Sequence, residues 1–62
     1  MDIASKTNFE KYFSLQSDSS LQFWKQSSDH FFKYSFGAPA SMIANAKEVR
    51  ALLVAEMKGR GI

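Results

Sequence analysis

The tripeptide Gly37-Ala38-Pro39 constrains the fold of this chain more than any other feature of its sequence. Glycine is favoured in the left-handed position after a helix, and proline cannot continue a helix that precedes it. The same proline loses nothing at the start of the next helix, where its missing N–H would have no partner. We therefore expect a helix on each side of this turn, folded back as an antiparallel hairpin.

The segment after the turn is the clearest helix of the chain. Residues 40–58 are rich in alanine, leucine, methionine, lysine and glutamate, which have high helix propensity. Apolar residues recur at steps of three and four, and they form a stripe wider than one thin partner helix would cover. The repeat comprises Met42, Ala46, Val49, Leu53 and Glu56, flanked by Ile43, Leu52 and Met57. Gly59 is predicted to end this helix.

The segment before the turn is predicted to hold two helices, over residues 8–16 and 19–36. Thr7 and Glu10 fit a capping box, which would start the first helix near Asn8. The serine-rich run at 17–20 offers caps for the second helix, although it could also lie inside one long helix. The alternation of Phe32, Tyr34 and Phe36 with polar residues has the period of a strand. We favour the helix, because a single short strand has nothing to pair with in this chain.

Length and composition limit how this fold is stabilised. A chain of 62 residues buries only about 60% of the surface that it exposes when unfolded, so its core is small. With no cysteine, neither a disulfide nor a thiolate zinc site is available. The 45% hydrophobic content is nevertheless that of a folded protein. We predict one small all-α domain over residues 1–62, with flexible ends at about 1–6 and 59–62.

The residues offer little for catalysis or for cofactors. The one histidine, His30, follows Asp29 directly, and neighbours in a helix point in different directions, so the two do not form a catalytic pair. The three glycines form no phosphate-binding loop. We expect no catalytic residue, no metal and no cofactor, and hence no enzyme.

Residues 23–36 hold six of the nine aromatic rings of the chain. We expect Phe9, Phe13, Trp24 and Phe31 to supply most of the core. In a helix the adjacent pairs Phe23-Trp24 and Phe31-Phe32 cannot both face inward, so one ring of each pair is predicted to stay exposed. The surplus rings, with Leu52 and Val54, would form an apolar patch that marks a binding surface. The predicted partner-binding residues are Phe23, Trp24, Phe31, Phe32, Tyr34, Phe36 and Leu52.

These observations favour a non-enzymatic module that binds a protein partner or a second copy of itself. It would be an accessory subunit of a larger assembly, or a small regulator or inhibitor of a bigger protein. An inhibitor encoded by a phage or a plasmid is one case of the second kind. No apolar run approaches the roughly 20 residues of a membrane-spanning helix, and the segment MDIASKTNFEKYF lacks the basic and apolar regions of a signal peptide. We therefore expect a cytoplasmic protein.

The excess of basic residues suggests an alternative. The net charge of +2 arises entirely after residue 36. Lys47, Arg50, Lys58 and Arg60 could contact phosphates in a small helical nucleic-acid-binding protein that acts as a dimer. Glu48 and Glu56 share that helix, which weakens this alternative. A membrane-surface role for the rings and lysines is less favoured, because the aromatic half of the chain carries no net charge.

Overall fold

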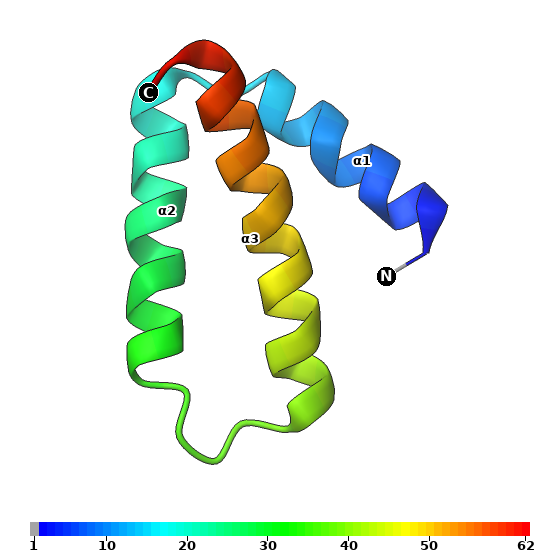
Figure 1. Cartoon of the computed structure of the whole chain (residues 1–62), viewed down its shortest axis with the longest axis vertical. Helices are drawn as coiled ribbons and strands as arrows, with labels where there is room; N and C mark the ends of the chain where they lie inside the picture. Colours follow the sequence, from blue (N-terminus) through cyan, green and yellow to red (C-terminus); the bar gives the residue numbers. More distant parts are fainter. Residues whose placement is uncertain (1) are drawn as a thin grey trace.

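The computed structural model describes residues 2–62 and contains three α-helices that are joined by short connections (Figure 1). They are α1 (Ile3–Ser14), α2 (Asp18–Lys33) and α3 (Ala40–Arg60), and no strand occurs within residues 2–62. The predicted all-α fold, with an antiparallel hairpin about the turn at residues 37–39, is confirmed. Residues 15–17 separate α1 from α2, so the two do not fuse into one helix, and the rest of the serine-rich run forms the first turn of α2.

The first helix begins at Ile3, five residues before the predicted start. Asp2 is its N-cap, and the carboxylate accepts a hydrogen bond of 2.7 Å from the backbone N–H of Ser5. This bond holds the pKa of the Asp2 carboxyl below its ordinary value, because it stabilises the charged form. The predicted cap at Thr7 is wrong: the Thr7 hydroxyl lies inside the helix and donates to the carbonyl oxygen of Ile3 at 2.9 Å.

The second helix begins where the serines predicted it and ends earlier than expected. The Ser17 hydroxyl accepts a hydrogen bond of 3.2 Å from the backbone N–H of Ser20. The helix ends at Lys33, three residues before the predicted end at residue 36. A tight turn follows, in which the N–H of Ala38 donates to the carbonyl oxygen of Ser35 at 3.1 Å. Gly37 occupies the third position of this turn with a φ of 81°, which glycine adopts without steric cost. The predicted role of Gly37 directly after the helix is therefore wrong.

The third helix begins at Ala40 as predicted but extends two residues past its predicted end. Gly59 lies inside the helix, and Gly61 takes the left-handed conformation that ends it, with a φ of 78°. The N–H of Gly61 donates to the carbonyl oxygen of Lys58 at 3.1 Å. Residues 3–6 and 59–60, which we expected to be flexible, are helical in the structure.

The core is small and lies where all three helices meet. Four residues are buried, one from α1, one from α2 and two from α3: Phe13, Leu21, Leu53 and Met57. Phe9, Val49 and Leu52 are partly buried against them. Only Phe13 is buried among the four rings expected in the core, since Phe9 and Phe31 are half-buried and Trp24 is 38% exposed. Phe9, Trp24 and Phe31 instead line hollows at the surface of residues 2–62.

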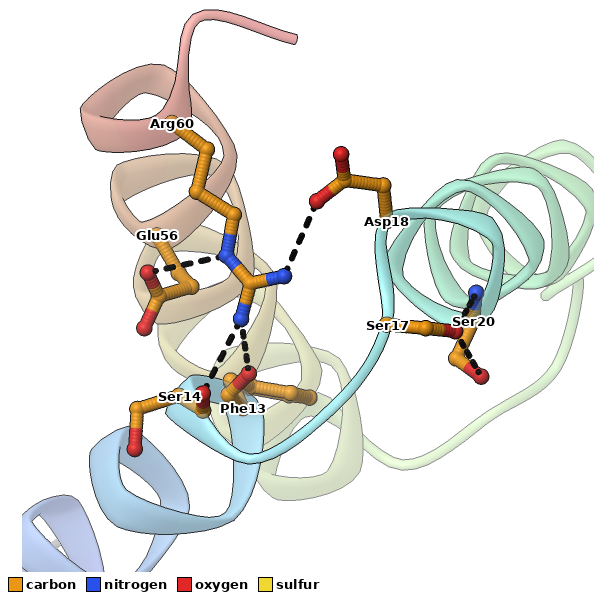
Figure 2. Close-up of polar contacts among 7 residues, drawn as sticks. All are labelled: Phe13, Ser14, Ser17, Asp18, Ser20, Glu56 and Arg60. Atoms are coloured by element: carbon orange, nitrogen blue, oxygen red, sulfur yellow. Dashed lines mark hydrogen bonds and ion pairs between the residues drawn. The ribbon is translucent and has the colours of Figure 1, made fainter.

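Arg60 fastens the end of α3 to the connection between α1 and α2 (Figure 2). One of its terminal nitrogens, Nη2, donates to the carbonyl oxygens of Phe13 and Ser14, each at 3.1 Å. The other, Nη1, donates to the Asp18 carboxylate at 3.0 Å, and Nε donates to Glu56 at 3.3 Å. The guanidinium therefore satisfies carbonyls that the end of α1 leaves without helical partners. The bond to Asp18 is the largest influence on the Arg60 pKa and raises it.

Candidate functional site

An apolar groove lies between α1 and α2, and α3 forms its floor. It consists of two adjoining hollows, of about 480 Å³ and about 400 Å³, which share Phe9 and Trp24. We call this surface the α1–α2 groove. The first hollow is lined by Ser5, Asn8, Phe9, Tyr12 and Trp24. The second is lined by Phe9, Trp24, Ser27, Ser28, Phe31, Phe32, Ala46, Val49, Arg50 and Leu53.

The groove exists because α1 and α2 diverge. Both helices pack against α3, and from their short connection at residues 15–17 they run apart (Figure 1). Near that connection the Trp24 ring contacts Tyr12 and Phe13 edge-on, with ring centroids 6.0 and 5.8 Å apart. Farther along, the apolar faces of the two helices face open space.

Two serines of α2, Ser27 and Ser28, are among the polar residues that line the groove. Ser27 is exposed, whereas the Ser28 hydroxyl oxygen is buried and has no hydrogen-bond partner within residues 2–62. A buried hydroxyl without a partner costs free energy, because water that it would bind in the unfolded chain is lost. The Ser28 hydroxyl is thus a donor and acceptor that is buried behind the groove wall, whereas Ser27 lies at its surface.

The molecule is more open than its size requires. A folded protein of this mass exposes about 4,000 Å², whereas this chain exposes 4567 Å². Its Cα radius of gyration of 11.9 Å also exceeds the value of about 10.6 Å that is typical of 62 residues. The excess of about 500 Å² approaches the roughly 800 Å² that each partner contributes to a standard protein interface.

The predicted patch of surplus aliphatic and aromatic residues is spread over more than one hollow. Phe32 and Val54 line one hollow, whereas Leu52 lines another, beside Lys6 and Glu48. Residues two apart on a helix are about 200° apart around its axis, so Leu52 and Val54 lie in different hollows, which share Ala51.

The aromatic residues predicted for partner binding are divided between three places. Trp24, Phe31 and Phe32 lie together in the α1–α2 groove. Phe23 is 68% exposed but does not line this groove. Tyr34 caps the end of α2, and Phe36 is 93% exposed in the following turn.

The two adjacent ring pairs behave differently from each other. Phe23 is exposed beside the more buried Trp24, as predicted. Phe31 and Phe32 are both half-buried, so the prediction of one exposed ring is wrong for this pair. The two rings touch edge-on with centroids 5.4 Å apart, and each is covered only in part because the groove beside them is open.

The four basic residues that were predicted to contact nucleic acid have different surroundings in the structure. Arg60 is bound to the α1–α2 connection. Arg50 forms an ion pair with Asp29 and lies over the Phe32 ring, 5.5 Å from its centroid. Lys47 and Lys58 have exposed side chains. Two of the four charged groups, those of Arg50 and Arg60, thus pair with other groups of the same chain.

Sequence reasoning missed the contribution of α1 to the site. Phe9 and Tyr12 form one wall of the groove, yet the sequence predicted only that they share an apolar face. The sequence did contain a sign of this role. Phe9, Tyr12 and Phe13 together form an apolar face that is wider than the small core can cover, so part of that face had to stay at the surface. Ser28 gave no signal, because a serine in a helix is ordinary until its surroundings are known.

Comparison with models of protein families, with curated proteins and with solved structures finds no match to this chain. Within residues 2–62, no helix has the length and apolar character needed to cross a membrane. Over the same residues, no three histidine, cysteine or acidic side chains gather as metal ligands would. The α1–α2 groove is the feature on which a functional proposal can be based.

Proposed function

We propose that this protein is a non-enzymatic interaction module and that its α1–α2 groove binds an amphipathic helix of a larger protein. The observation that carries the proposal is the apolar groove itself, about 400 Å³ at its core, which is left open between two helices packed on a third. An accessory subunit or a small regulator would both use such a surface.

A helix is the occupant that best fits the groove. Two helices that diverge across a third leave the position that a further helix occupies in a four-helix bundle. An amphipathic helix in such a groove would bury its apolar face against Phe9, Trp24 and Phe31.

A partner of different sequence fits better than a second copy. Within residues 2–62, a second copy offers no helix whose exposed large apolar residues follow the three- and four-residue steps of an amphipathic face. Those residues are Ile3 and Tyr12 on α1, Phe23 and Trp24 on α2, and Met42 and Val54 on α3. The remaining exposed large apolar residues, such as Phe36, are scattered over separate elements.

Substitution of Ser27 by lysine is expected to abolish partner binding without unfolding the chain. Ser27 is exposed on the groove wall, so a long charged side chain there would occupy the apolar site and leave the core intact. Gln26→Lys is the matched control, because Gln26 is also exposed on α2 and does not line the groove. We expect the dissociation constant to rise by at least about tenfold for Ser27→Lys and by less than about twofold for Gln26→Lys.

The partner for this measurement is obtained by placing a photo-crosslinking amino acid at residue 27, and at residue 26 as control, in the producing cells. A protein captured only from residue 27 is then purified and titrated with each variant. Equal binding by both lysine variants would contradict the proposal, as would capture of only a second copy of the chain. Binding that collapses with rising salt would instead favour the phosphate-binding alternative.

A further inference from the structure

A second surface lies on the other side of the Phe32 and Arg50 side chains, where α2 and α3 meet. Two hollows, of about 400 Å³ and about 220 Å³, adjoin there and share Val54. We call this surface the α2–α3 seam. Phe32 and Arg50 line both the seam and the α1–α2 groove, so they form the wall between the two surfaces.

The seam concentrates positive charge around an apolar strip. Four of the eight basic residues of the chain line its two hollows, and no acidic residue lines either. These four are Lys25, Lys47, Arg50 and Lys58. Asp29 neutralises Arg50, which leaves three lysines with exposed side chains. Between them lie the apolar side chains of Phe32, Val54 and Ile62, of which Val54 and Ile62 are each about 40% exposed.

From this arrangement we infer that the α2–α3 seam is a second docking surface, which binds an acidic amphipathic helix of a partner protein. Lys47 and Lys58 are eleven residues apart on α3, about 16 Å along its axis, which corresponds to three turns of a bound helix. Apolar side chains of that helix would enter the hollows at Val54, and flanking carboxylates would meet the lysines. Complementary charge of this kind sets the specificity and the rate of association.

The apolar strip distinguishes an acidic protein segment from the other anionic partners. Phosphate contacts to nucleic acid use cations and polar donors, and they leave apolar side chains without a role. Single-stranded nucleic acid stacks on exposed rings, but the one ring in the seam, Phe32, is half-buried and covered by Arg50. A bilayer surface cannot fill a hollow between two helices, whereas the side chains of a peptide helix can.

The test uses a synthetic three-turn amphipathic peptide with leucine on one face and glutamate on both flanks, titrated into the full chain labelled with ¹⁵N. We expect amide shifts at Ala51 and Val54 and little change at Phe9. Lys47→Glu combined with Lys58→Glu should weaken binding by at least about tenfold. The matched control is Lys11→Glu with Lys33→Glu, which changes the net charge equally at exposed positions that line neither hollow of the seam. Far-UV circular dichroism verifies that each variant is folded.

Several results would overturn the inference. No binding of the acidic peptide, equal binding of a peptide with lysine in place of glutamate, or equal effects of the two charge-reversed variants would each do so. Tighter binding of duplex DNA or of phosphatidylserine vesicles at the same amides would reassign the seam to those partners. The groove variant Ser27→Lys should bind the peptide normally, so failure of the seam and failure of the α1–α2 groove are distinguished.

Discussion

Replacement of Leu53 by alanine is expected to leave most of the chain unfolded at 25 °C. Leu53 is 1% exposed and belongs to a core of four buried residues to which every helix contributes. Leucine-to-alanine changes at such positions lower the free energy of unfolding by about 2–5 kcal/mol. Domains of this size seldom have more than about 3–5 kcal/mol of stability from their core. Urea denaturation followed by far-UV circular dichroism measures the loss.

Leu15→Ala is the matched control for this substitution. It removes the same atoms from a side chain that is 76% exposed at the end of α1, so we expect a change within about 0.5 kcal/mol. Equal stability of the two variants would show that α3 does not pack through Leu53 as described.

Substitution of Arg60 by alanine is expected to lower the midpoint of thermal unfolding by about 5 °C or more. The guanidinium donates to the carbonyls of Phe13 and Ser14 and to the Asp18 carboxylate, so it joins the ends of all three helices (Figure 2). Its loss would remove the donor to the Ser14 carbonyl and one of two donors to the Phe13 carbonyl, which also accepts from the backbone N–H of Gln16. The side-chain link between the ends of α1 and α3 would then be lost. Hydrogen exchange should therefore quicken first in α1.

Two further variants identify the cause of the Arg60 effect. Lys58→Ala removes the same charge from the last turn of α3, but Lys58 is exposed, so the midpoint should barely change. Arg60→Lys keeps the charge and loses the planar fork that reaches carbonyls and carboxylate together, so we expect an intermediate midpoint. If Arg60→Ala were as stable as Lys58→Ala, the contacts of Arg60 would contribute nothing to the fold.

The helices were predictable from local patterns in the sequence, and their ends were less so. Gly37-Ala38-Pro39 and the serine-rich run divide the chain as expected, because backbone preferences of glycine, proline and serine act locally. The true start of α1 depends on Asp2, which competes with the more familiar capping box at Thr7. The true end of α3 is set by Gly61, which competes with Gly59 as the terminating glycine, and the contacts of Arg60 with residues more than forty positions earlier appear in no local pattern.

The sequence predicted that the candidate site would contain exposed aromatic rings, but it did not predict where on the fold the site lies. The number of rings indicated that some would remain uncovered, and Trp24, Phe31 and Phe32 do line the α1–α2 groove. The sequence could not predict that α1 and α2 diverge, because the angle between helices follows from side-chain packing on α3. For the same reason Phe9 and Tyr12 were not assigned to the site, and Leu52 lies in a different hollow from the predicted rings of the groove.

We expect the isolated chain to be a folded monomer whose α1–α2 groove is open. The fluorescence of Trp24 reports directly on whether the groove is open. Trp24 is the only tryptophan of the chain and lies in the groove with 38% of its surface exposed. Acrylamide quenching of its fluorescence, measured over about a hundredfold range of protein concentration, is the decisive measurement. We predict quenching clearly weaker than in urea, clearly above that of a buried ring, and independent of concentration. Quenching as strong as in urea would show that α1 and α2 do not pack around Trp24. Quenching that disappears, at all concentrations or as the concentration rises, would show that the groove is closed or is filled by a second copy.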